Sequence, residues 1–172
     1  MVGAAPVRLR LRRVCLRISR QPSLLLMRIL VHPGSSSPAK RWHHSKWVEF
    51  IAAIRADGHS IDLVGGPAEI RYVQTIASAA KITATTDLAL GELVRRIQAA
   101  DAYIGHDSGP AHIAAGCGKL CLLLWWGDDE QLARWKPTGD VTIVRGPVVD
   151  GKNRVDTLTV QEALGAFRSW LL

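Results

Sequence analysis

The chain has few cysteines and no apolar run of membrane-spanning length, and each shortage excludes a class of protein. Only Cys15, Cys117 and Cys121 are cysteines among its 172 residues, and their spacing does not match a zinc site. We interpret them as buried thiols of a reducing compartment, with a disulfide or metal role as the minor alternative. No apolar segment is long enough to cross a bilayer as a helix, so an integral membrane protein is not indicated.

Acidic residues are absent from positions 1–28, which contain seven arginines and account for the whole net charge of +7. Outside this stretch the basic residues equal the 15 acidic residues in number. A neutral body does not supply the basic groove that nucleic acids require, so we expect no nucleic-acid partner. A hydrophobic content of 48% with a mean hydropathy of +0.09 indicates a globular domain with a substantial core.

Residues 1–23 form a basic arm that we separate from a domain at residues 24–172. The alternation from Val7 to Arg12 is compatible with an edge strand, a contact with an anionic membrane or a disordered tail, and we favour the tail. The arm is arginine-rich like an organelle transit peptide, but it has little serine, and Arg28 interrupts the apolar core that a signal peptide needs. A start codon placed too far upstream, or a frameshift, would also explain the arm.

From Leu24 onward, apolar strand patterns alternate with helical patterns. We expect strands at Leu24–His32, Ser60–Gly65, Lys81–Ala84, Ala102–Gly105, Lys119–Trp125 and Val141–Val144. We expect helices at Ser45–Ala56, Ala68–Ala80, Leu90–Ala100, Pro110–Ala115 and Val160–Leu171. This alternation predicts an α/β fold with an open, doubly wound, Rossmann-like parallel sheet, in which ligands bind beyond the carboxyl ends of the strands.

The segment Ala102–Ala115, AYIGHDSGPAHIAA, combines an apolar strand, a polar turn and a small-residue helix. Asp107, Ser108 and Gly109 are residue types that cap a helix and allow close backbone approach, and proline is favoured at the first helical position. A helix start has orphan N–H donors and partial positive charge, so it suits a pyrophosphate, with His112 beside that anion. The alternative is a simple capped turn with a surface histidine.

Three other predicted turns contain polar residues suited to a nucleotide. His32–Trp42, HPGSSSPAKRW, combines glycine, hydroxyls and two cations that suit phosphate, although it lacks the Walker pattern GxxxxGK[ST]. A flexible linker is the alternative for this segment. In Gly65–Glu69, the carboxylate of Glu69 suits either the helix dipole or ribose hydroxyls. Thr85–Glu92 begins a helix with apolar residues that can flank a base ring.

These turns together resemble the C-terminal, nucleotide-sugar-binding domain of glycosyltransferase family nine, the ADP-heptose:lipopolysaccharide heptosyltransferases. The shared segments are HPGSSSPAKRW, VGGPAE and TDLALGELVRRIQAADAYIGHDSGPAHIAA, in that order and at the family's usual separations. The resemblance covers roughly residues 29–146 and leaves the basic arm outside it. It implies one half of a GT-B glycosyltransferase, located in the cytoplasm, with at most peripheral contact between the basic arm and the inner membrane.

The resemblance also implies roles for ten donor-binding residues. Ser35 and Ser36 with Lys40 would hold the diphosphate and neutralise the charge on the ADP leaving group. Glu69 would bind the ribose, and Leu88 or Leu90 would line the adenine slot. Asp107 would bind sugar hydroxyls, while the amides of Ser108 and Gly109 with His112 would bind phosphate. We expect no essential metal and no cofactor.

In that family the acceptor site and the catalytic carboxylate come from an N-terminal half, which this chain does not show ahead of His32. We therefore assign no catalytic residue and expect the general base in that other half, so whether this chain is itself an enzyme stays open. One hypothesis is the donor half of a heptosyltransferase, truncated or working with a partner chain and a lipopolysaccharide-core acceptor. The others are a non-catalytic module or degenerate paralogue that binds a nucleotide-sugar, and an unrelated α/β domain that docks through its arm.

One loop departs from the family pattern. Trp125–Asp129, WWGDD, stands where the family usually has one aromatic residue and less charge. This difference is a candidate for reshaping the sugar pocket.

Overall fold

The structure is a computed structural model that describes residues 26–171. The basic arm at residues 1–23, the start of the first expected strand and Cys15 lie outside the described residues. Within the described part of the chain, no helix combines the length and the apolar character needed to cross a membrane.

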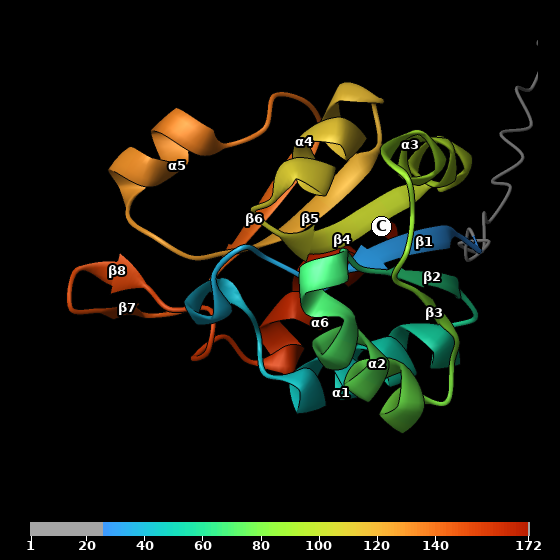
Figure 1. The fold of residues 1–172 in the computed structure, drawn as a ribbon. Helices are drawn as coiled ribbons and strands as arrows, with labels where there is room; N and C mark the ends of the chain where they lie inside the picture. The colour runs from blue at the N-terminus through green and yellow to red at the C-terminus, as the bar shows by residue number, and fades with distance from the viewer. Residues whose placement is uncertain (1–25, 172) are drawn as a thin grey trace, which may run out of the picture.

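Six parallel strands form one sheet in the order β3-β2-β1-β4-β5-β6 (Figure 1). They are β1 (Arg28–His32), β2 (Ser60–Val64), β3 (Ala84–Thr85), β4 (Ala102–His106), β5 (Leu120–Trp125) and β6 (Val141–Arg145). The chain moves outward in one direction from β1 to β3 and in the other from β4 to β6, so the order reverses between β1 and β4. The predicted doubly wound, Rossmann-like sheet is therefore confirmed.

Helices cover both faces of the sheet (Figure 1). One face packs against α1 (His44–Ala56), α2 (Ile70–Ala80) and α6 (Val160–Arg168), and the other against α3 (Leu90–Ala99) and α4 (Gly109–Gly116). Alternate strand residues serve the two cores, because successive side chains of a strand point to opposite faces. In β1, Ile29 and Val31 face the first core and Leu30 faces the second.

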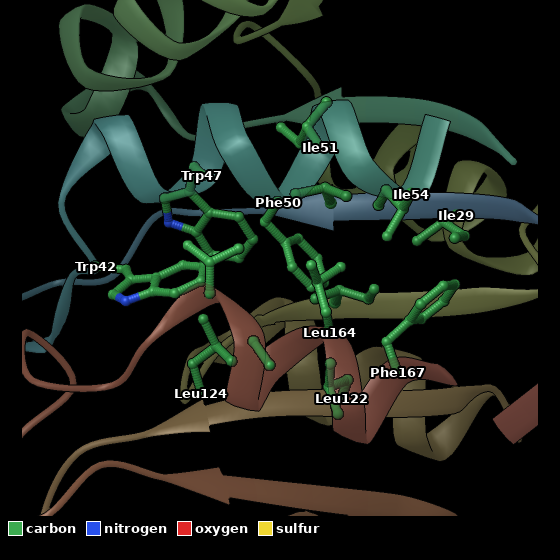
Figure 2. Close-up of a cluster of buried hydrophobic side chains, with 14 of the residues drawn as sticks. Ile29, Trp42, Trp47, Phe50, Ile51, Ile54, Leu122, Leu124, Leu164 and Phe167 are labelled. Atoms are coloured by element: carbon green, nitrogen blue, oxygen red, sulfur yellow. The ribbon is translucent and has the colours of Figure 1, made fainter. Parts of the chain in front are cut away.

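The first core is aromatic. Trp42, Trp47, Phe50 and Phe167 are fully buried there and meet edge to face, with ring centroids 5.4 Å apart for Trp42 and Trp47 and 6.4 Å apart for Phe50 and Phe167 (Figure 2). This geometry is the one that aromatic quadrupoles favour. The core therefore joins α1 and α6 to the sheet, and it also holds Trp42 at the end of the loop that follows β1.

The second core is built from smaller side chains where α4 meets the sheet. Ala111, Ala114 and Ala115 of α4 are buried against β4 and β5. Gly105 of β4 also allows close packing, because a Cβ at this position would lie 2.6 Å from the backbone oxygen of His32. These small residues let the ends of β1 and β4 and the beginning of α4 approach one another closely.

Four parts of the structure differ from the sequence predictions or go beyond them. The third strand is Ala84–Thr85 rather than Lys81–Ala84, because Lys81 ends α2 with a left-handed backbone at φ 53°. Cys121 is buried as expected, but Cys117 is only half-buried at the end of α4. The helix at Asp129–Trp135 and the hairpin at residues 148–153 were not predicted.

The remaining elements are α5 (Asp129–Trp135), β7 (Val148–Val149), β8 (Lys152–Asn153), and the 3-10 helices η1 (Pro38–Lys40), η2 (Pro67–Glu69) and η3 (Ser169–Leu171).

The aromatic core predicts the stability effect of a single truncation. Phe167→Ala should lower the free energy of unfolding by about 3–5 kcal/mol, because it removes a fully buried ring and leaves a cavity. Leu90→Ala is the matched control, since Leu90 is 67% exposed and its loss should change stability by no more than about 0.5 kcal/mol. Urea unfolding followed by tryptophan fluorescence measures both, and equal losses would contradict the assigned core.

Candidate functional site

Two loops meet where the strand order reverses. Residues 33–43 follow the carboxyl end of β1, and Asp107 with Ser108 follows the carboxyl end of β4, its neighbour in the sheet. An open parallel sheet binds its ligands in the crevice at this reversal, because the two following loops diverge to opposite faces. The region between these two loops, called the crevice from here on, is the candidate functional site.

Three charged or ionisable side chains converge at the start of α4. The Lys40 ammonium lies 3.4 Å from Oδ2 of Asp107, and Nε2 of His112 lies 3.8 Å from Oδ1 of the same carboxylate. The Asp107 side chain is 17% exposed, whereas that of His112 is 47% exposed. The structure thus brings together three predicted residues from two different loops, with the two nitrogen-bearing groups partly open to a ligand.

The backbone start of α4 is not capped by a side chain. Ser108 is the N-cap residue, but its hydroxyl donates to the backbone oxygen of His106 at 3.2 Å instead of accepting from the helix. Gly109 follows it, and a Cβ there would meet nothing within 4 Å. Of the three cap-type residues Asp107, Ser108 and Gly109, the one at the N-cap position therefore makes no side-chain cap bond, and the helix start keeps the donors and partial charge that favour an anion.

The loop after β1 is held by Arg41. Its Nε and Nη2 both donate to the backbone oxygen of Ser35, at 2.9 and 2.6 Å. Ser35 is 1% exposed, and its hydroxyl has no hydrogen-bond partner among the described residues, whereas Ser36 is exposed. The sequence assigned Ser35 and Ser36 together to the diphosphate, but the structure buries the first and exposes the second.

His106 fixes the other end of this loop. Its Nε2 accepts the backbone N–H of Trp42 at 3.0 Å, and its Nδ1 lies 3.2 Å from the backbone oxygen of Leu124. A carbonyl only accepts, so Nδ1 holds the proton and the ring is neutral. Burial lowers the pKa of His106 to about 3, because the charged form loses its hydration. The neutral ring joins the loop after β1 to both β4 and β5.

Glu69 lies against the same loop. The carboxylate accepts the backbone N–H of Gly66 at 2.7 Å, and Nε2 of His32 lies 3.7 Å from Oε2. Burial lowers the pKa of His32, and the Glu69 carboxylate opposes that shift. A Cβ at Gly34 would lie 2.6 Å from both carboxylate oxygens. Glycine at position 34 is thus required for the observed position of Glu69.

A small cavity of about 80 Å³ lies beside His32. Apolar groups dominate its lining, with Val64, Leu88, Leu93 and Pro110 among them. Leu90 does not line it and is 67% exposed. Of the two leucines predicted for a base slot, the structure brings only Leu88 to this cavity and adds Leu93 from the first turn of α3.

Sequence reasoning overlooked the groups that position the site. Arg41 and His106 were visible inside the quoted motifs, but their hydrogen-bond partners are distant in sequence or belong to the backbone. Trp126 was noted only as a departure, yet the Lys40 ammonium lies 5.4 Å from its ring centroid. Within residues 26–171, no group of three or more His, Cys, Asp or Glu side chains is arranged to hold a metal ion.

Comparison with known proteins shows one family. Residues 21–150 match the family described as Glycosyltransferase family 9 (heptosyltransferase). Lipopolysaccharide heptosyltransferase 3 of Escherichia coli is 30% identical over 115 residues, which are 63% of this chain and 33% of that protein. The chain therefore spans about a third of the length of this curated relative.

Solved structures share the fold. The E. coli ADP-heptose lipopolysaccharide heptosyltransferase II superposes with a TM-score of 0.71 at 22% identity, over 84% of this chain and 46% of that one. The E. coli heptosyltransferase WaaC with ADP gives a TM-score of 0.71 at 19% identity, over 88% of this chain and 46% of that one. At these identities the likeness establishes the α/β fold.

The neutral ring of His106 predicts an acid-dependent loss of stability. An unfolded histidine titrates near 6.5 and this one near 3, so the unfolded chain binds the extra proton between those values. The stability that depends on a neutral ring is complete above pH 6.5 and is lost toward pH 3, by roughly 1 kcal/mol per pH unit. His106→Gln keeps an acceptor for Trp42 without titrating, so its unfolding free energy should fall less steeply than that of the wild type.

Urea unfolding between about pH 6.5 and pH 4.5 measures the two slopes. His44→Gln is the matched control, because it removes a histidine at the start of α1 that does not join the two loops. It should keep the wild-type slope. Identical slopes for wild type and His106→Gln would show that His106 does not stay neutral in the folded protein.

Proposed function

This chain belongs to glycosyltransferase family 9, the heptosyltransferase family, and we propose that the crevice between β1 and β4 binds an ADP-sugar donor. By family the sugar would be heptose, and the reaction an inverting transfer to a lipopolysaccharide core. The structurally similar E. coli WaaC was solved with ADP, which supports ADP as the nucleotide.

The observation that carries this proposal is the convergence of Lys40, Asp107 and His112 at the start of α4. A diphosphate here would face the Lys40 ammonium, the His112 imidazole and the uncapped amides of Ser108 and Gly109. Donors already aimed at the leaving diphosphate would stabilise the charge that develops as the bond to the sugar breaks. Asp107, held between Lys40 and His112, would then accept hydrogen bonds from hydroxyls of the sugar.

The remaining predicted residues extend the donor site on either side of this cluster. The buried hydroxyl of Ser35 lacks a partner among the described residues, and a phosphate oxygen would supply one. Glu69 would receive the ribose hydroxyls, and the cavity lined by Leu88 and Leu93 would receive an edge of the adenine. Ser36, which is exposed, would contact the diphosphate from the solvent side.

A non-catalytic nucleotide-sugar-binding module is the second candidate function. The two carboxylates in the crevice are already engaged, Asp107 with Lys40 and Glu69 with the backbone N–H of Gly66. Neither is therefore assigned as the general base that removes a proton from an acceptor hydroxyl. For catalysis we propose that a partner domain or chain supplies this base together with the acceptor site.

Isothermal titration calorimetry of the full chain with ADP and with ADP-heptose tests the donor site. Binding of both supports the proposal, and an absence of heat at millimolar ligand would reject it for this chain. Binding without transfer to a lipopolysaccharide acceptor, even when an acceptor-binding half of a family member is added, would favour the non-catalytic module.

Two substitutions test the diphosphate contacts. Lys40→Ala and His112→Ala should each weaken ADP binding by about tenfold or more, because a charge-assisted hydrogen bond contributes roughly 1.5–3 kcal/mol. Lys136→Ala removes an exposed lysine at the end of α5 and is the matched control. Wild-type affinity in either site variant would remove that residue from the proposed site.

A third substitution tests the proposed role of Glu69 in ribose binding and leaves the Glu69 side chain itself unchanged. Gly34→Ala should displace the Glu69 carboxylate and weaken ADP binding by about tenfold, which corresponds to roughly 1.4 kcal/mol of lost contact. Gly91→Ala is the control, because a Cβ there would meet only the end of the Arg95 side chain at 3.9 Å. Unchanged ADP affinity in Gly34→Ala would exclude Glu69 as a ribose ligand.

A further inference from the structure

A second hollow adjoins the proposed donor site. It is a groove of about 600 Å³ between η1 and the β7–β8 hairpin, which falls within the size range of small-ligand sites. Trp126 forms part of its wall, and the charged residues Arg41, Lys152 and Arg154 line it together with Asp150 and Asp156. The roles proposed above for the donor site do not use Trp126, Lys152 or Arg154.

The hairpin wall of this groove is fixed to the end of β5. Gly127 and Asn153 exchange backbone hydrogen bonds at 3.1 and 3.2 Å, and the buried Asn153 side chain also donates to the Gly127 oxygen at 2.7 Å. Gly127 has φ 118°, a conformation that favours glycine. Trp126 and Lys152 are thus held as neighbours, with the Lys152 ammonium 5.2 Å from the indole centroid.

Trp126 also connects the groove to the donor site. The Lys40 ammonium lies 5.4 Å from the Trp126 ring centroid and 3.4 Å from Oδ2 of Asp107. One lysine side chain therefore separates the indole from the carboxylate proposed to bind the donor sugar. A ligand in the groove would lie next to the site of transfer.

Three basic and two acidic side chains line the groove, and this excess of one positive charge favours an anionic ligand, with Lys152 as the group available to bind it. Arg154 is paired with Asp156 through two hydrogen bonds of 2.9 and 2.7 Å, and Arg41 is bonded to the Ser35 oxygen. Within residues 26–171, no carboxylate lies at ion-pair distance from Lys152. The partly exposed Trp126 indole beside it offers an apolar face of the kind that stacks against rings.

We propose that this groove is a saccharide subsite in which Trp126 stacks against a sugar ring and Lys152 binds a carboxylate or phosphate group of that sugar. This subsite is additional to the acceptor site, which we propose above to come from a partner domain or chain. The binding of an acidic sugar in the groove is independent of the proposed donor function.

Saturation-transfer NMR on the full chain tests the subsite with glucuronic acid, glucose 6-phosphate and glucose as probes. Both acidic sugars should bind at millimolar concentration, and glucose should bind more weakly. Lys152→Ala should weaken binding of the acidic sugars by about tenfold and leave glucose unchanged, because only the charged contact is lost. Trp126→Ala should weaken all three.

Trp135→Ala and Lys136→Ala are the matched controls, because both residues are exposed at the end of α5 and lie outside the groove. Both should bind the probes like the wild type. The fold of every variant is checked by its amide NMR spectrum, and Trp126→Phe, which keeps an aromatic face, should retain most of the binding. Wild-type binding by Lys152→Ala or Trp126→Ala, or no transfer to either acidic sugar, overturns the proposal.

The same NMR experiment in the presence of saturating ADP distinguishes a failure of the saccharide subsite from a failure of the donor site. Persistence of the acidic-sugar signal with ADP bound supports a separate subsite, whereas its loss shows that the sugar occupies the donor crevice and overturns the proposal. If the chain binds acidic sugars but not ADP, the subsite stands and the proposed donor function fails.

Discussion

The two hydrogen bonds of His106 hold together the parts on which the candidate site depends. β1 and β4 are neighbours in the sheet, but the loops after them lead to helices on opposite faces, so the loops separate unless something joins them. The neutral imidazole does so by accepting from Trp42 and donating to Leu124. Trp42 is also fixed by its indole N–H, which donates to the Leu158 oxygen at 2.8 Å. The loop after β1 is thus anchored in the aromatic core, which reduces the ordering that a ligand at this loop must impose.

The fold was predictable where burial leaves a strong pattern in the sequence. β4 and β5 are nearly continuous apolar runs, because a central parallel strand is covered on both faces. α5 has no buried residue and the β7 strand is exposed, so neither produces an apolar periodicity that sequence analysis could detect. The third strand was misplaced because Lys81 adopts a left-handed conformation that is rare for a residue with a side chain.

The candidate site was predictable only as far as topology determines it. The carboxyl ends of neighbouring parallel strands lie at one edge, so the meeting of Lys40 with Asp107 follows from the strand order. The choice between Leu88 and Leu90 depends on where α3 begins, and the sequence pattern places a helix start only to within one or two residues. The two bonds from Arg41 to the Ser35 oxygen depend on loop geometry, which residue types alone do not specify.

The position of Lys40 between Asp107 and the Trp126 ring makes one ammonium group common to two adjacent regions. A ligand that draws the Lys40 ammonium toward the start of α4 moves that ammonium relative to the Trp126 indole. A ligand stacked on the indole restricts, in turn, the positions that the Lys40 side chain can adopt. Any resulting change in affinity is reciprocal, because the free energy of binding both ligands is the same in either order. A single flexible side chain can thereby couple the occupancy of two sites without movement of the sheet.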